Sequence, residues 1–232
     1  MKIRIKFTKY GALKFIGHLD VMRYFQKAIR RAGIDVAYSA GFSPHQIMSF
    51  AAPLGVGLTS DGEYFDIEVH SVTSSEDMKK RLNDTMAEGI RILSVLALPE
   101  KSKNAMASVA AAGYEIHFRE GHEPDFSLDE AIRHFHEQDQ VLYIKKTQKN
   151  EITLDLKQSV YEIVLQKNNS IYLLVDASSA GNIKPVMVME ALYREYDKVP
   201  GEFDFCVHRT ETYLRDENTG MLKPLDSIGQ AF

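Results

Sequence analysis

The most constraining feature of this sequence is the stretch KFIGHLDVMRYFQKAIRRAGIDVAYSAGFSPHQIMSFAAP, residues 14–53. Its apolar residues recur at steps of three and four from Leu19 onward, at Met22, Phe25, Ile29 and Ala32. This spacing places them on one face of an α-helix that packs against a core. Gly33 follows the last of them and is typical of a helix C-terminus, and Gly17 or His18 marks the N-terminal boundary.

The opposite face of this predicted helix is basic. Its cationic residues are Arg23, Lys27, Arg30 and Arg31. Asp20 lies one turn before Arg23 and is within reach of it. Two interpretations stay open, because lysine and arginine normally form the solvated face of a surface helix, whereas a row of cations also suits a polyanion.

The N-terminal half predicts an α+β unit. Residues 2–7 alternate basic and apolar, which is typical of a half-buried strand. Asp61 and Gly62 predict a turn, and Thr73 and Glu76 have the spacing of a capping box that opens a second helix. We interpret the order as strand, helix, two strands, helix, strand, which is the ferredoxin-like arrangement. The predicted strands are 2–7, 36–39, 47–51, 64–70 and 91–98, and the predicted helices are 19–33 and 73–89.

The C-terminal half repeats this pattern without repeating the sequence. Ser127 and Glu130 form a second capping box, and Pro185 suits the first turn of another helix. The predicted strands are 114–119, 141–146, 152–156, 161–165, 171–175 and 205–212. We therefore predict two tandem ferredoxin-like (βαββαβ) domains with antiparallel sheets. Their expected limits are 1–98 for the first domain, 99–111 for a linker, 112–214 for the second domain and 215–232 for a C-terminal tail.

Several classes of function are disfavoured by what the sequence lacks. A single cysteine, Cys206, cannot hold an iron–sulfur cluster, and we expect it to be a buried structural thiol. His134 and His136 are two residues apart on a helix, so they make a poor metal pair. We find no phosphate-binding loop, no apolar run of membrane-spanning length and no signal peptide. We expect a cytoplasmic protein without a metal, a cofactor of its own or a membrane partner.

Charge is unevenly distributed along the chain. Residues 1–50 contain nine Lys and Arg against two Asp, a balance of +7, although the whole chain has a net charge of −4. A basic segment on an acidic protein suggests a polyanion site. Lys2, Arg4 and Lys6 would lie on the open face of the first sheet, where RNA-binding sheets hold strands. An exposed charged strand face is the plain alternative.

The turn after the basic helix is the second candidate for anion binding. A turn that contains glycine and proline presents backbone N–H groups to a phosphate, and cationic side chains lie nearby. The residues that we assign to this turn are Gly41, Phe42, Ser43 and His45. His18 and His45 are also candidates for acid–base catalysis, although a histidine at a helix start more often caps or packs, and Pro44-His45 is more often a rigid turn.

Two runs, KFIGHLDVMRYFQKAIRRAG and AYSAGFSPHQIMSFAAPLGVG, resemble a bacterial radical-SAM-linked family of unknown function. Members of that family are encoded beside, or fused to, a radical-SAM protein with a cobalamin-binding-like region. This sequence departs from the family pattern at Gly17, Ser43 and Gln46, where serine, asparagine and proline are expected. The resemblance implies a radical-SAM partner, whose iron–sulfur chemistry would lie on another chain.

Three hypotheses follow for the function. The leading one is an accessory RNA-binding protein that presents a structured RNA, such as tRNA or rRNA, to the radical-SAM partner. The second is a metal-independent ribonuclease that uses His18 or His45. The third is a protein-interaction module whose basic helix docks on the radical-SAM protein.

Overall fold

The structure of the chain is a computed structural model that describes residues 1–146 and 151–232. It is a mixed α+β protein whose strands pair antiparallel in the registers described below. The chain forms two compact units, residues 1–110 with 209–232, and residues 111–208. The segment from 209 onward, which we assigned to the second domain and a tail, therefore packs with the first unit.

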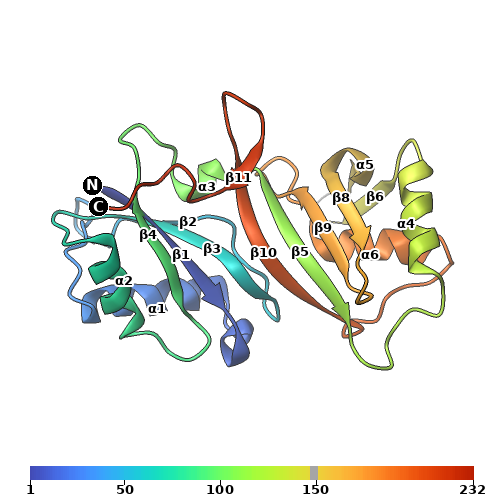
Figure 1. The fold of residues 1–232 in the computed structure, drawn as a ribbon, viewed down its shortest axis with the longest axis horizontal. Helices are drawn as coiled ribbons and strands as arrows, with labels where there is room; N and C mark the ends of the chain where they lie inside the picture. The colour runs from blue at the N-terminus through green and yellow to red at the C-terminus, as the bar shows by residue number, and fades with distance from the viewer. Residues whose placement is uncertain (147–150) are drawn as a thin grey trace. The chain divides into compact units, whose positions relative to one another are not determined.

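The first unit is built on an antiparallel sheet (Figure 1). Strand order is β4-β1-β3-β10, with β2 paired to β3 and β11 paired to β10. On β1, Ile5 lies opposite Phe65 of β3 and Val95 of β4. The elements are β1 (Lys2–Lys9), the 3₁₀ helix η1 (Gly11–Phe15), α1 (His18–Arg31), β2 (Met48–Phe50), β3 (Thr59–Glu68), α2 (Ser75–Asn83), β4 (Ile92–Ala97), α3 (Ala105–Ser108), β10 (Phe205–Arg215) and β11 (Leu222–Pro224).

One face of this sheet packs against α1 and α2. The alternation along β1 turns Ile3, Ile5 and Phe7 to this face, as the sequence predicts. Phe25 of α1 lies at the centre, with its ring 4.7 Å from that of Phe7 and 4.6 Å from that of Phe65. Val21, Ile29, Met78 and Leu82 complete the contact from the two helices.

The other face of the sheet is covered rather than open. The C-terminal segment returns over it, and both chain ends lie in the first unit (Figure 1). Arg4 is completely buried, because its guanidinium donates to both Asp66 carboxylate oxygens, at 2.8 and 2.9 Å, and to the Leu225 carbonyl at 2.7 Å. Further along the segment, Gln230 bridges to Ala97 of β4. The expectation that Arg4 faces an open surface is therefore wrong.

Gly62 shows why β3 is longer than predicted. We expected a turn at Asp61 and Gly62, but both residues lie inside β3. A Cβ atom on Gly62 would lie 2.4 Å from the Cα atom of Glu211, and the Thr212 hydroxyl donates to the Gly62 carbonyl at 2.7 Å. The glycine permits the close approach of β10, which is a contact over about 150 residues of sequence that no local pattern reveals.

The second unit has its own hydrophobic core. Strand order is β5-β9-β8, and β6 and β7 form a separate two-stranded sheet. Helices α4 and α6 supply Ala131, Phe135, Val188 and Leu192 to the core. Ser127 caps α4, as its capping box predicts. The elements are β5 (Ala111–Phe118), α4 (Leu128–Glu137), β6 (Leu142–Lys146), β7 (Glu151–Asp155), α5 (Leu156–Ser159), β8 (Val160–Leu165), β9 (Ile171–Asp176) and α6 (Pro185–Arg194).

The structure leaves one further expectation unconfirmed and departs from two others. The tandem ferredoxin-like arrangement is not confirmed, and Cys206, which we expected to be buried, is exposed. In place of the predicted strand 36–39 the structure has isolated bridges at Val36 and Tyr38. Within residues 1–146 and 151–232, no helix is both long enough and apolar enough to span a membrane.

We predict that Phe25→Ala lowers the free energy of unfolding of the first unit by about 3–5 kcal/mol, because it removes the ring at the centre of the core. Urea denaturation followed by circular dichroism measures this change. The matched control is Phe15→Ala in η1, where the side chain is 64% exposed and the loss should stay within about 0.5 kcal/mol. Equal losses for the two variants would contradict this account of the core.

The buried pair of Arg4 and Asp66 gives a second prediction. Arg4→Ala leaves the Asp66 carboxylate buried without its guanidinium and should cost about 3–5 kcal/mol. The double variant Arg4→Met with Asp66→Leu removes both charges and should be more stable than Arg4→Ala alone. A double variant that is less stable than the single one would show that the charges themselves hold the C-terminal segment in place.

Candidate nucleic-acid interface

Helix α1 positions the basic residues. It begins after Gly17, runs for 14 residues and buries Val21, Phe25, Ala28 and Ile29 in the core. Because successive residues are 100° apart, the positions opposite this face point to solvent. Arg23, Lys27, Arg30 and Arg31 are all exposed, as predicted from the period.

The four cations form a continuous row on the helix surface, in the order Arg30, Arg23, Lys27 and Arg31 around the axis. Arg31 donates to the Thr85 carbonyl at 3.3 Å, on the flank of α1 that faces the end of α2. At the other end of the row, Arg30 donates to the Gln26 carbonyl at 3.3 Å. The nearest acidic group is Asp20, 3.5 Å from Arg23, and both side chains are exposed. We call Arg23, Lys27 and Arg30 the basic surface.

The loop 39–45 stands beside the basic surface because its base is attached to α1. Tyr38 and Gln46 form a bridge, and Ser39 N–H donates to the His45 carbonyl at 2.8 Å. The Gln46 side chain is buried, and its amide donates to the Gln26 carbonyl of α1 at 3.1 Å. Gln26 lies one turn from Arg30 and from Arg23, so this bond fixes the loop next to both. Sequence reasoning did not assign Gln46 to the site.

Within the loop, most predicted site residues are exposed. Gly41 has φ +105°, a conformation that glycine adopts readily, and Phe42, Ser43 and His45 are exposed. A hydrogen bond of 2.9 Å joins the His45 Nδ1 and Ser39 Oγ atoms, and the His45 N–H also donates to Ser39 Oγ at 3.1 Å. That N–H is therefore engaged within the loop, in contrast to a turn that offers all its N–H groups to a phosphate.

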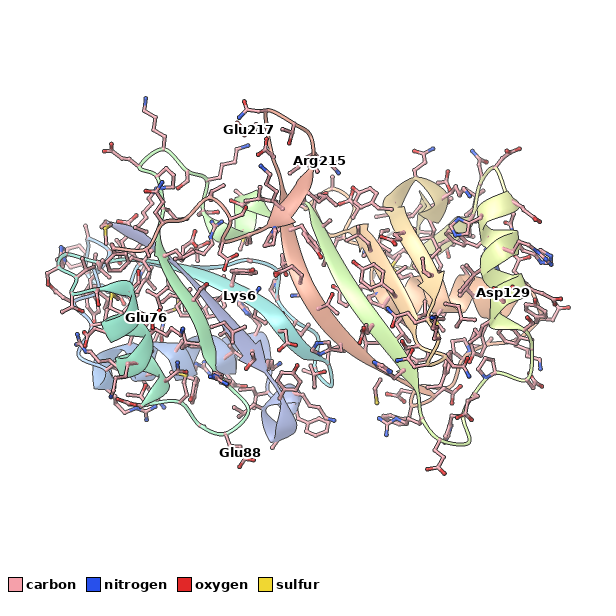
Figure 2. The ribbon with its side chains drawn as sticks, viewed as in Figure 1. Lys6, Glu76, Glu88, Asp129, Arg215 and Glu217 are labelled. Carbon is pink, nitrogen blue, oxygen red and sulfur yellow. The ribbon has the colours of Figure 1, made fainter. Side chains whose placement is uncertain are left out.

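The cations of β1 are placed differently from the expectation. Arg4 is buried in its ion pair, and Lys2 is only partly exposed. Lys6, marked on β1 in Figure 2, donates to Glu211 at 2.5 Å. The Tyr64 hydroxyl donates to the other oxygen of Glu211 at 2.7 Å, so the carboxylate holds β1, β3 and β10 together. Arg4 and Lys6 therefore hold the first unit together rather than form an open face.

The two histidines proposed for catalysis are separated. His18 lies in the first turn of α1, with its ring 5.3 Å from that of Phe50. His45 belongs to the loop attached at Gln26, about 12 Å further along the helix. The two candidates therefore belong to different elements of the first unit, one to α1 and one to the loop 39–45. In the described part of the chain, no group of three or more His, Cys, Asp or Glu side chains is placed to hold a metal ion.

A buried charged cluster next to His18 was missed by the sequence analysis. Lys9 is 1% exposed, and its ammonium donates to the Ile16 carbonyl at 3.0 Å. Glu63 accepts from Arg209 at 2.8 Å, and Arg209 also donates to the Ala52 carbonyl at 2.8 Å. Lys9, Glu63 and His18 line one small cavity.

Burial lowers the pKa of Lys9, the nearby Glu63 carboxylate opposes this shift, and Arg209 adds to it. One signal was available in the sequence. Lys9 continues the odd-numbered positions of β1, which otherwise face the core. The cluster anchors the chain before α1 and so supports the start of the helix that carries the basic surface.

Comparison with other proteins places the chain in a family but assigns it no activity. No curated protein matches the sequence. A chain in the solved structure "Crystal Structure of a Cbf5-Nop10-Gar1 Complex" is 10% identical with a TM-score of 0.48. The match covers 97% of this chain and 60% of that chain, so this protein spans little more than half the length of its structural match. Such a likeness indicates nothing about function. The profile of the bacterial family described as "Uncharacterized protein conserved in bacteria (DUF2344)" matches residues 2–185, and the chain belongs to that family.

Proposed function

We propose that this protein is a cytoplasmic RNA-binding accessory protein that holds a structured RNA, such as tRNA or rRNA, for a radical-SAM modifying partner. One observation carries the RNA-binding part of the proposal. Three exposed cations, Arg23, Lys27 and Arg30, share a side of α1 with the loop 39–45, which the Gln46–Gln26 bond holds beside them. The partner is proposed from the resemblance of residues 14–57 to the radical-SAM-linked family.

The chemistry of the basic surface suits phosphate. Arg23 and Arg30 carry guanidinium groups, which bind two phosphate oxygens at once, and Lys27 adds a point charge. The ion pair between Arg23 and Asp20 is exposed on both sides, and such surface pairs contribute about 0–1 kcal/mol. A phosphate that offers two charged oxygens therefore competes well for Arg23.

The ribonuclease hypothesis finds less support. It requires His18 or His45 to reach a scissile phosphate as the acid or the base. His18 packs against Phe50 and lines a small cavity, and the His45 ring is bonded to Ser39 within the loop. Binding without cleavage is the function that this geometry supports best.

A second candidate function, docking of a protein partner, is favoured by exposed apolar side chains at the start of α1. Phe15 and Leu19 are more than half exposed on either side of the junction between η1 and α1. Val56 is equally exposed, and its neighbour Gly57 donates to the Lys14 carbonyl at 2.8 Å, which brings this loop to η1. We call Phe15, Leu19 and Val56 the apolar corner. Exposed apolar groups that gather in one place are typical of protein interfaces.

The ferredoxin-like arrangement belongs to the same proposal. Along the chain the first unit has the order β1, α1, β2, β3, α2, β4. Both β2 and β10 pair with β3, and with β10 left aside the strand order is β4-β1-β3-β2. This order supports a ferredoxin-like ancestry for the first unit. The same assignment for the second unit rests on its sequence pattern.

Reversal of charge on the basic surface tests RNA binding. We expect Arg23→Glu with Lys27→Glu to lower the affinity for a tRNA by about 100-fold or more, since two charge-assisted contacts are replaced by repulsion. Filter binding over a salt series measures it, and the slope of log K against log salt should become shallower by about 1–2. The control is Lys80→Glu with Arg91→Glu, the same change of charge at exposed positions of the same unit. Equal affinities for both double variants would remove the proposed interface.

The apolar corner gives a separate prediction. Leu19→Ser with Val56→Ser should prevent copurification of the radical-SAM protein from a nuclease-treated bacterial lysate, because docking buries both side chains. Arg23→Glu with Lys27→Glu should leave this copurification intact. Retention of the radical-SAM protein by the serine variant, or its loss from the wild type on nuclease treatment, would exclude the apolar corner as the docking site.

A further inference from the structure

Phe42 is a large apolar side chain that the fold leaves unburied. Its side chain is fully exposed at the tip of the loop 39–45. Tyr38, at the base of the same loop, is half exposed. A single exposed aromatic residue is common on protein surfaces and needs no explanation. Here, however, two of them stand on one loop beside the basic surface.

Hydrogen bonds hold the base of the loop 39–45 in place. The Ser39 N–H donates to the His45 carbonyl and the Ile47 N–H donates to the Ala37 carbonyl, at 2.8 and 2.9 Å. The side chains of Ser39 and His45 add a further bond of 2.9 Å, and the Gln46 amide reaches α1. These bonds fix where the loop leaves the sheet, and the Gln46 bond attaches its base to α1 at Gln26, one helical turn from Arg23 and Arg30.

We infer that Phe42 stacks on an unpaired nucleobase, so that the RNA bound here is recognised through a single-stranded loop rather than through duplex. This inference rests on the proposed RNA-binding function and names the class of RNA. Bases in a duplex are already stacked on one another, and the RNA major groove is too narrow for a side chain to reach them. Bases of a loop are splayed out and offer a π-face to an aromatic ring.

The charges around Phe42 favour RNA over an apolar protein pocket as the occupant. Arg23, Lys27 and Arg30 would contact the phosphates on either side of the stacked base, which is the combination that single-strand binding proteins use. Tyr38 offers a second ring for the adjacent base. An apolar pocket of a protein partner, by contrast, would offer these three cations no counter-charge.

The chain contains no tryptophan, which permits a direct test. Phe42→Trp introduces a single indole at the loop tip, and its fluorescence should be quenched, in a saturable way, by an RNA hairpin with an unpaired loop. A blunt duplex with the same stem should leave it unchanged. The control is Phe203→Trp, an exposed phenylalanine of the second unit, which neither RNA should affect. Equal quenching of the Phe42→Trp protein by hairpin and duplex would overturn the inference.

RNA-binding affinities complete the test, and they distinguish failure of the proposed RNA-binding function from failure of the stacking inference. Phe42→Ala should weaken hairpin binding by about 5- to 100-fold and leave duplex binding unchanged, and Phe42→Tyr should restore most of the loss. If the wild-type protein binds neither RNA, the proposed function itself fails. If it binds RNA with the expected salt dependence but Phe42→Ala has wild-type affinity, only the stacking inference fails.

Discussion

Burial of β1 on both of its faces is the constraint on which the rest of the first unit depends. Ile3, Ile5 and Phe7 pack under α1 and α2, and on the other face Arg4 pairs with Asp66 and Lys6 with Glu211. A buried arginine is tolerated only when its donors are satisfied, and Arg4 reaches Asp66 and the Leu225 carbonyl. The charges of Arg4 and Lys6 are thus paired inside the first unit, whereas the cations of α1 face solvent.

The attachment of the loop 39–45 to α1 gives the basic surface its shape. A row of cations on an isolated helix would attract any polyanion equally well. The amide of Gln46 attaches the base of the loop to α1 at Gln26, so the proposed RNA would meet the cations and the aromatic side chains of the loop together. A site whose parts are already in place loses less conformational entropy on binding. The buried position of Gln46 is consistent with this positioning role.

The sequence predicts the parts of the fold that depend on local periodicity and misses those that depend on distant partners. The period of α1 gives its exposed cations and the buried positions Phe25, Ile29 and Ala32, and the alternation of β1 gives its core face. The period places Leu19 on the buried face as well, but Leu19 is 59% exposed and Val21 is buried instead. The burial of Arg4 could not be predicted, because Leu225, which accepts one of its hydrogen bonds, lies 221 residues away. Gly62 was interpreted as a turn because Glu211, which approaches it closely, is also remote in sequence. The basic surface was predictable, but Gln46, which attaches the loop, was not.

The apolar corner and the basic surface differ in chemistry, and they involve different parts of α1. Leu19 belongs to its first turn, and Lys27 lies eight residues further, a rise of about 12 Å. A protein that presents one macromolecule to another needs two surfaces that can be occupied at once and that keep a fixed separation. One helix anchored by Phe25 meets both needs, because its apolar start and its basic middle cannot move relative to each other. The rigidity of α1 thus links the core to the proposed presenting role.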